Sequence, residues 1–109
     1  MTRVAAIDCG TNSIRLLVAD VDSTLYEVDR RLEIVRLGEN VDRTGRLAAG
    51  ALARTMASLE RYVRLIDELG ASRVRMVATS ATRDAANREE FVDGVTRLLG
   101  LAPEVISGD

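Results

Sequence analysis

The fold is decided by a stretch near the amino terminus that reads VAAIDCGTNSIRLLVA, residues 4–19. Two apolar runs, residues 4–7 and 14–19, flank a short segment of small and polar residues. Short apolar runs that are separated by Gly, Asn and Ser are typical of paired β-strands joined by a turn. The stretch therefore predicts two adjacent strands at the start of the chain.

The turn between these strands, residues 8–13, offers several groups that bind phosphate. Gly10 lets the backbone approach an anion closely and point N–H groups at it. The hydroxyls of Thr11 and Ser13 and the amide of Asn12 add hydrogen-bond donors, and Asp8 adds a carboxylate that can hold a divalent cation. The same residue types are common in ordinary hairpin turns. The residues alone therefore leave two interpretations open, a phosphate-binding loop and a plain turn.

The composition limits the kind of protein that this chain can be. A chain of 109 residues with 47% hydrophobic and 29% charged residues is one globular domain. Cys9 is the single cysteine and there is no histidine, which excludes an internal disulfide, the usual zinc sites and histidine-based triads. The net charge of −2 predicts no nucleic-acid partner, and no apolar run is long enough to cross a membrane. We therefore expect a cytoplasmic protein whose carboxylates perform any acid–base chemistry.

Three successive strands with short links are expected in the first half of the chain. After the first strand, the expected elements are strands over residues 14–20 and 25–37 and a loop over residues 38–45. In the third strand Leu32 and Ile34 alternate with Glu33 and Val35, which predicts one apolar face and one mixed face. Short links between successive strands predict an antiparallel meander.

Helices and strands alternate in the second half. The expected elements are a helix over residues 47–69, a strand over residues 73–78, a helix from Asn87 to Gly100 and a strand over residues 104–106. The first helix is expected to bury a stripe that consists of Leu52, Met56, Leu59, Val63 and Ile66. Asn87 and Glu90 resemble a capping box at the start of the second helix. This alternation predicts parallel pairing, and so an α/β fold with a mixed sheet of about five strands.

The turn after the fourth strand is a second candidate for phosphate binding. Ligands on α/β sheets bind beyond the carboxyl ends of the strands, so this turn and the turn at residues 8–13 are expected to face one crevice. Thr79, Ser80 and Thr82 can cap a helix start, where backbone N–H groups favour anions, and Arg83 adds a positive charge. Capping alone also explains the hydroxyls, and a solvated surface position also explains Arg83.

Two residues beside the first turn have more than one interpretation. Arg15 lies within an otherwise apolar strand, where it either points into the crevice as a phosphate ligand or reaches solvent from a sheet edge. Cys9 is expected to pack as a small apolar residue rather than act as a nucleophile, because there is no histidine or lysine to activate its thiol.

Three segments together resemble a known family. They read AAIDCGTNSIRLLV, ATSATRDAAN and VISG, at residues 5–18, 78–87 and 105–108. In these segments, their order and their spacing, the chain resembles the amino-terminal part of the exopolyphosphatase and guanosine pentaphosphate phosphohydrolase (Ppx/GppA) family. That family lies within the superfamily of actin, sugar kinases and heat-shock chaperone ATPases. The resemblance covers essentially all of the chain and implies a ribonuclease H-like fold.

The resemblance also implies an activity and a site. It implies a hydrolase that removes terminal phosphate from inorganic polyphosphate or guanosine pentaphosphate with Mg²⁺. Asp8 would lie near the metal ion. The residues that would bind phosphate are Gly10, Thr11, Asn12, Ser13, Arg15, Thr79, Ser80 and Arg83. The full-length form is expected to be a homodimer.

The catalytic base is not expected among these residues. In the family, the Ser-Gly pair seen here at residues 107–108 is followed after one more residue by paired glutamates, one of which is the base, whereas this sequence stops at Asp109. We therefore expect residues 1–109 to be the amino-terminal part of a first actin-like domain. The rest of that domain and a second one would be absent, through an incomplete gene model or a fragment of a longer chain.

These expectations lead to a specific picture of the 109-residue chain. Without its final helix, part of one sheet face would be uncovered, so the chain would be marginally stable or would associate through that patch. It would also be inactive alone. Two alternatives to the hydrolase stay open: a noncatalytic phosphate- or nucleotide-binding module or sensor, and, ranked lower, an ATP-dependent kinase of the same superfamily.

Overall fold

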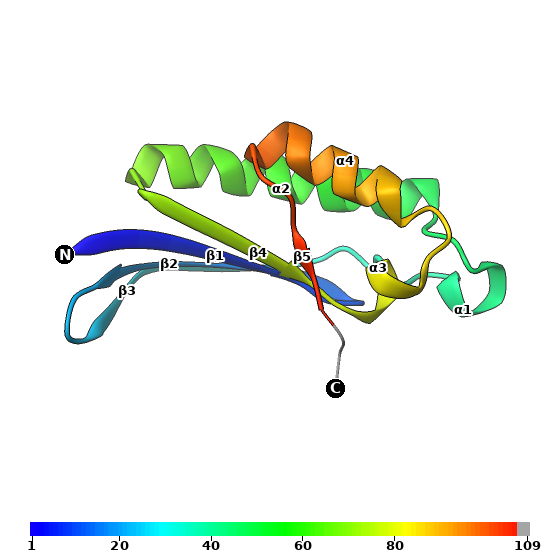
Figure 1. Cartoon of the computed structure of the whole chain (residues 1–109), viewed down its shortest axis with the longest axis horizontal. Helices are drawn as coiled ribbons and strands as arrows, with labels where there is room; N and C mark the ends of the chain where they lie inside the picture. Colours follow the sequence, from blue (N-terminus) through cyan, green and yellow to red (C-terminus); the bar gives the residue numbers. More distant parts are fainter. Residues whose placement is uncertain (107–109) are drawn as a thin grey trace.

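A mixed β-sheet with helices on one face forms the body of the computed structural model, which describes residues 1–106 (Figure 1). The strands are β1 (Thr2–Cys9), β2 (Ser13–Val21), β3 (Leu25–Ile34), β4 (Arg73–Ala78) and β5 (Glu104–Val105). Their order across the sheet is β3-β2-β1-β4-β5. The first three strands pair antiparallel, whereas β1 with β4 and β4 with β5 pair parallel. The expected α/β class, meander and parallel pairing are confirmed.

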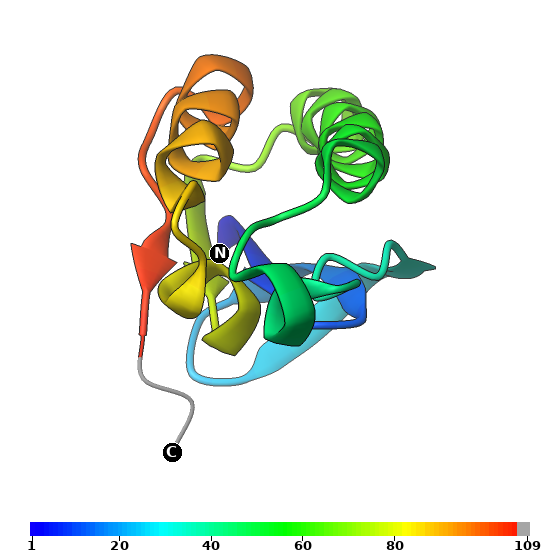
Figure 2. The same ribbon diagram turned by 90° about the vertical axis from the view of Figure 1, so that its right-hand side faces the viewer.

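The helices divide into a long pair and two short ones. They are α1 (Val41–Thr44), α2 (Ala49–Leu69), α3 (Ser80–Asp84) and α4 (Arg88–Leu99). In both views α2 and α4 lie side by side over the same sheet face, while α1 and α3 sit at the end where β1 and β4 finish (Figures 1 and 2). None of the helices within residues 1–106 is long and apolar enough to cross a membrane.

The short helix α1 lies where the sequence predicts only a loop, so that prediction is wrong. Asn40 before it and Gly45 after it both adopt left-handed backbone conformations, with φ of 62° and 71°. Gly45 donates its N–H to the carbonyl of Val41 at 2.7 Å. A single turn closed at both ends in this way has no apolar periodicity for a sequence pattern to detect.

The core lies between the sheet and the two long helices. Alternate residues of the central strands point into it, because successive side chains of a strand face opposite ways. These buried strand residues are Ala5, Ile7, Cys9, Ile14, Leu16, Val18 and Met76. The helices contribute Leu59, Tyr62, Ile66, Phe91 and Val95.

The buried stripe of α2 differs from the predicted one. Leu59 and Ile66 are buried as expected, but three other residues of that stripe are only partly buried: Leu52, Met56 and Val63. Thr55 and Ser58 occupy buried positions instead. The difference arises because α2 faces both the sheet and α4, and the Met56 side chain fills the space beside Gly94 of α4.

The face of β3 predicted to be apolar is exposed, and the predicted cap of α4 is wrong. Leu32 and Ile34 on that face are 52% and 58% exposed, because the face has no helix over it among the described residues. Asn87 precedes α4 but does not cap it with its side chain. The amide bonds the backbone of Leu47 instead, accepting from its N–H at 2.7 Å and donating to its carbonyl at 3.1 Å.

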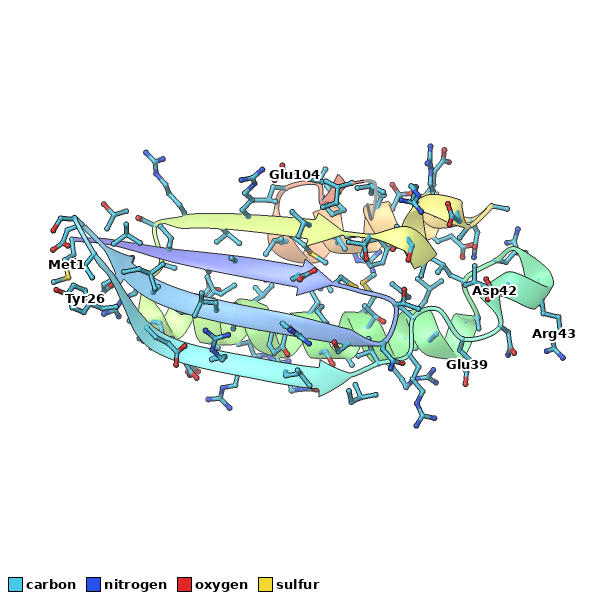
Figure 3. All side chains as sticks on the ribbon, turned by 90° about the horizontal axis from the view of Figure 1, so that it is seen from below. Met1, Tyr26, Glu39, Asp42, Arg43 and Glu104 are labelled. Atoms are coloured by element: carbon cyan, nitrogen blue, oxygen red, sulfur yellow. The ribbon has the colours of Figure 1, made fainter. Side chains whose placement is uncertain are left out.

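The face of the sheet opposite α2 and α4 is open in the described part of the chain. Figure 3 looks onto this face, with the strands in front and the two helices behind them. A hollow of about 550 Å³ lies on it, lined in part by Leu17, Leu32, Val77 and Ile106. The uncovered, partly apolar sheet face expected from the sequence is therefore present.

Polar contacts fix α2 on the sheet at three places. At one end, Arg3 donates to the Asp20 carboxylate at 2.8 and 3.0 Å and to the Leu69 carbonyl at 2.9 Å. Near the middle, the buried Tyr62 hydroxyl donates to the Ile14 carbonyl at 2.9 Å. Beside it, the Arg61 guanidinium pairs with the Glu33 carboxylate, which also accepts from Ser58.

We expect Tyr62→Phe to destabilise the chain by about 1 kcal/mol, because the buried hydrogen bond from the Tyr62 hydroxyl to the Ile14 carbonyl would be lost. Urea unfolding measures this difference. Tyr26→Phe is the matched control, since Tyr26 is 51% exposed and its change should stay within about 0.5 kcal/mol. Equal effects of the two substitutions would contradict the role given to the Tyr62 hydroxyl.

The pairing with Arg61 predicts a specific pH dependence of stability. Hydrogen bonding to Arg61 lowers the pKa of Glu33 below its ordinary value of 4.5. A group with a lower pKa in the folded state contributes its full stability above its unfolded pKa and loses it as the pH falls through the folded pKa. The loss of stability caused by Glu33→Gln should therefore be largest above pH 4.5 and shrink below it. Unfolding of Glu33→Gln and of the exposed control Glu89→Gln at several pH values tests this, and a pH-independent difference contradicts it.

Candidate phosphate-binding site

The turn between β1 and β2 presents unpaired backbone donors at the end of the sheet. Gly10 donates its N–H to the Ser13 carbonyl at 3.0 Å, so the segment closes as a tight hairpin connection. Thr11 and Asn12 are exposed, and their backbone N–H groups have no acceptor among the described residues. Donors of this kind at a tight turn suit an anion. The segment is thus a hairpin turn that also has the groups required by the phosphate-loop interpretation.

The turn after β4 meets this first turn directly. The Thr11 and Ser80 hydroxyl oxygens lie 3.1 Å apart, within hydrogen-bond distance. The Thr79 N–H donates to the Cys9 carbonyl at 3.2 Å, which extends the pairing of β1 and β4 by one residue. The convergence of the two turns expected from the sheet topology is confirmed.

A hollow of about 250 Å³ lies between the two turns and the short helix α1. It is lined by Thr11, Gly38, Val41, Asp42, Ser80, Ala81 and Asp84. Asp42 is labelled in Figure 3 beside the end of the sheet where the two turns lie. The hollow is therefore built from three segments that are distant in sequence, and α1, which the sequence did not predict, forms one wall.

The hydroxyls after β4 do not cap α3, so this explanation of them is wrong. Thr79 precedes α3 but makes no capping hydrogen bond through its side chain. Ser80 faces Thr11 instead. The Thr82 hydroxyl is buried and has no hydrogen-bond partner among the described residues. With φ and ψ of −118° and −146°, Thr79 has a backbone that continues the strand almost to the start of the helix.

Asp8 and Arg15 lie on the open sheet face rather than in the hollow between the turns. They are directly opposite each other in the register of β1 and β2, and both line the larger hollow on that face. Neither side chain has a hydrogen bond or ion pair within residues 1–106. The placement of Arg15 at a sheet edge is wrong, because β2 is flanked by β3 and β1. Its exposed guanidinium lies instead on the open sheet face, opposite the Asp8 carboxylate of the neighbouring strand β1.

Arg83 is held beside its neighbour in sequence. Its side chain is 35% exposed, and its Nε donates to the Asp84 carboxylate at 3.0 Å. This hydrogen bond lowers the pKa of Asp84. Asp84 lines the hollow between the turns, so Arg83 is connected to that hollow through its carboxylate partner.

Cys9 has the properties of a packed residue. Its side chain is 1% exposed, and burial, followed by the charge of Asp8, raises the pKa of its thiol to about 12. A thiol with this pKa is protonated at neutral pH and is not a nucleophile. The expectation of a small apolar packing role is confirmed.

Sequence reasoning missed the segment that contacts the first turn from the other side. Gly38 donates its N–H to the Thr11 carbonyl at 2.8 Å, and the N–H groups of Val35 and Arg36 both donate to the Asn12 carbonyl, at 3.0 and 2.9 Å. Gly38 was the available signal, because a glycine in a loop often marks a close approach of two backbones.

No group of three Asp, Glu or Cys side chains within residues 1–106 is arranged to hold a metal ion.

Comparisons with known proteins agree on one family. The model of the Ppx/GppA phosphatase family matches residues 16–109. Exopolyphosphatase 2 of Mycobacterium tuberculosis is 52% identical over 118 residues, covering 99% of this chain. A bifunctional 3-dehydroquinate synthase/phosphatase of Fusobacterium nucleatum is 38% identical over 96% of the chain. This chain spans 37% of the length of the first relative and 17% of the second.

Solved structures have the same fold. A Ppx/GppA family member of Aquifex aeolicus superposes with a TM-score of 0.93 at 42% identity, over 98% of this chain and 35% of its own. An exopolyphosphatase-like protein gives a TM-score of 0.94 at 51% identity, over 98% of this chain and 33% of its own. The ribonuclease H-like fold implied by the resemblance is confirmed. Sequence and structure together show that the chain belongs to the Ppx/GppA phosphatase family.

Proposed function

We propose that this chain serves in the hydrolysis of terminal phosphoanhydride bonds of inorganic polyphosphate or guanosine pentaphosphate, and that residues 8–13 form its first phosphate loop. The observation that carries the proposal is the contact between Thr11 and Ser80, which joins the two turns beside unpaired backbone N–H groups. Support also comes from the 52% identity to the M. tuberculosis protein named exopolyphosphatase 2.

The chemistry of the joined turns suits a phosphoryl group. Transfer of a phosphoryl group spreads negative charge over its outer oxygens, and enzymes stabilise that charge with fixed N–H donors and cations. The N–H groups of Thr11 and Asn12 and the hydroxyls of Thr11 and Ser80 supply donors in this proposal. Arg15 supplies a positive charge from the open face. Arg83 supplies a second positive charge when its guanidinium leaves the Asp84 carboxylate and binds phosphate instead.

Mg²⁺ is part of the proposal, with Asp8 as its protein ligand. Mg²⁺ commonly takes one or two carboxylates and completes its coordination with substrate phosphates and water. An exposed carboxylate one residue before the end of β1, next to a phosphate loop, fits that pattern. When bound, the ion would neutralise charge on the phosphate oxygens.

The proposal assigns no catalytic base among the described residues, and it places the base outside residues 1–109. Binding without turnover is then the expected behaviour of the 109-residue chain. The homodimer and the cytoplasmic location expected above belong to the same proposal, and no contact within residues 1–106 bears on either.

We predict that the chain binds inorganic polyphosphate in Mg²⁺ and that Asp8→Asn weakens this binding about tenfold, with a much smaller effect when EDTA replaces Mg²⁺. Calorimetry measures binding, and phosphate release from polyphosphate and from guanosine pentaphosphate is assayed on the same samples. Asp93→Asn, which changes an exposed carboxylate of α4, is the control.

The outcomes test both the binding site and the position of the catalytic base. Absence of binding by the folded chain contradicts the proposed function. Binding together with phosphate release that Asp8→Asn abolishes supports the function but shows that the described carboxylates suffice for turnover. Binding of polyphosphate without phosphate release is the expected result for this chain alone.

A further inference from the structure

The backbone of residues 35–38, which we name the bracing segment, is fixed in position before it reaches the first turn. Val35 and Leu37 are 1% and 0% exposed, so their side chains anchor the segment in the core. From α2, Arg54 donates to the Val35 carbonyl at 3.0 Å and to the Glu39 carboxylate at 3.0 Å. The bracing segment is therefore attached to the core and to the longest helix.

The bracing segment determines which way two peptide groups of the turn point. Its N–H groups bind the carbonyl oxygens of Thr11 and Asn12. In a planar trans peptide the carbonyl and the following N–H point in opposite directions, and residues 1–106 contain no cis peptide bond. The N–H groups of Asn12 and Ser13 therefore point away from the bracing segment.

Gly38 is the place where the two backbones come closest. A Cβ atom at this position would lie 2.3 Å from the Thr11 Cγ2 methyl, but 3.4 Å from the Thr11 carbonyl oxygen and 3.5 Å from its Cβ. The first of these distances is impossible for two non-bonded carbon atoms, whereas the other two are ordinary van der Waals contacts. The steric conflict with a side chain at position 38 thus comes mainly from one methyl group.

Arg36 shows that the backbone here is held under strain. It has a φ of 52°, a left-handed conformation that an arginine rarely adopts. Strained backbone of this kind persists where the surrounding contacts impose it. In this conformation the N–H groups of two successive residues, Val35 and Arg36, reach the same Asn12 carbonyl.

We propose that Gly38 is a positioning residue for the phosphate-binding turn: its lack of a side chain lets the bracing segment hold the Thr11 and Asn12 carbonyls, which turns the N–H groups of Asn12 and Ser13 away from that segment. The Asn12 N–H is one of the donors assigned above to phosphate. The positioning of the turn stands on the geometry alone. Its consequence for phosphate affinity rests on the proposed function of residues 8–13.

The test is a double-mutant cycle between Gly38→Ala and Thr11→Ser. Thr11→Ser keeps the hydroxyl that faces Ser80 but removes the methyl that a Cβ at position 38 would strike. Amide ¹H–¹⁵N shifts of Asn12 and Ser13 report the turn, and calorimetry with inorganic polyphosphate reports affinity. Gly50→Ala is the control, because its nearest contact would be 3.5 Å away, at the end of the Arg54 side chain.

We expect Gly38→Ala to shift the Asn12 and Ser13 amides and to weaken polyphosphate binding about tenfold in the wild-type background. In the Thr11→Ser background the same substitution should have little effect on either readout, and Gly50→Ala should have little effect in both. If Gly38→Ala alone does not fold, recovery of the folded state by Thr11→Ser is the supporting result.

Three results would overturn the positioning role: no amide shift in Gly38→Ala, equal shifts in both backgrounds, or no recovery of a misfolded Gly38→Ala by Thr11→Ser. The variants could show the expected coupling in their amide shifts while the wild-type chain has no affinity for polyphosphate. That result would contradict the proposed function and leave Gly38 as the residue that positions the turn.

Discussion

The pairing of β1 with a different partner on each side is the constraint on which the rest of the molecule depends. β1 runs antiparallel to β2 and parallel to β4, and Cys9 at its end lies opposite both Ile14 and Ala78. Because of this shared register, the turn that leaves β1 and the turn that leaves β4 start at the same end of the sheet. The Thr11–Ser80 contact follows from this arrangement, as does the hollow beside it.

Much of this could be predicted from the sequence, because the responsible signals are local and periodic. Apolar runs and helical spacing predicted the meander, the parallel pairing and both long helices, and Gly70 and Gly100 correctly marked the ends of α2 and α4. The exposure of Leu32 could not be predicted, since alternation shows that two faces differ but not which one a helix covers. Likewise, spacing alone could not show that α2 faces both the sheet and α4, which shifted its buried residues toward Thr55 and Ser58.

The candidate site was predicted in its parts but not in its arrangement. The two turns and their convergence followed from residue types and topology. The separation of Asp8 and Arg15 from the hollow between the turns did not, because it depends on which sheet face each side chain occupies. The bracing segment was missed for a similar reason: its contacts with the turn are made by backbone atoms, and the one trace in the sequence is Gly38.

The proposed function depends on residues 10–13 and Ser80 binding a phosphate group together. The most direct measurement is a titration of the ¹⁵N-labelled chain with inorganic polyphosphate in Mg²⁺, followed residue by residue through the backbone amide shifts. We expect the largest changes at Thr11, Asn12, Ser13 and Ser80. Changes confined to Arg30 and Arg75, two of the arginines on the open sheet face, or no changes in a folded chain, would contradict this assignment.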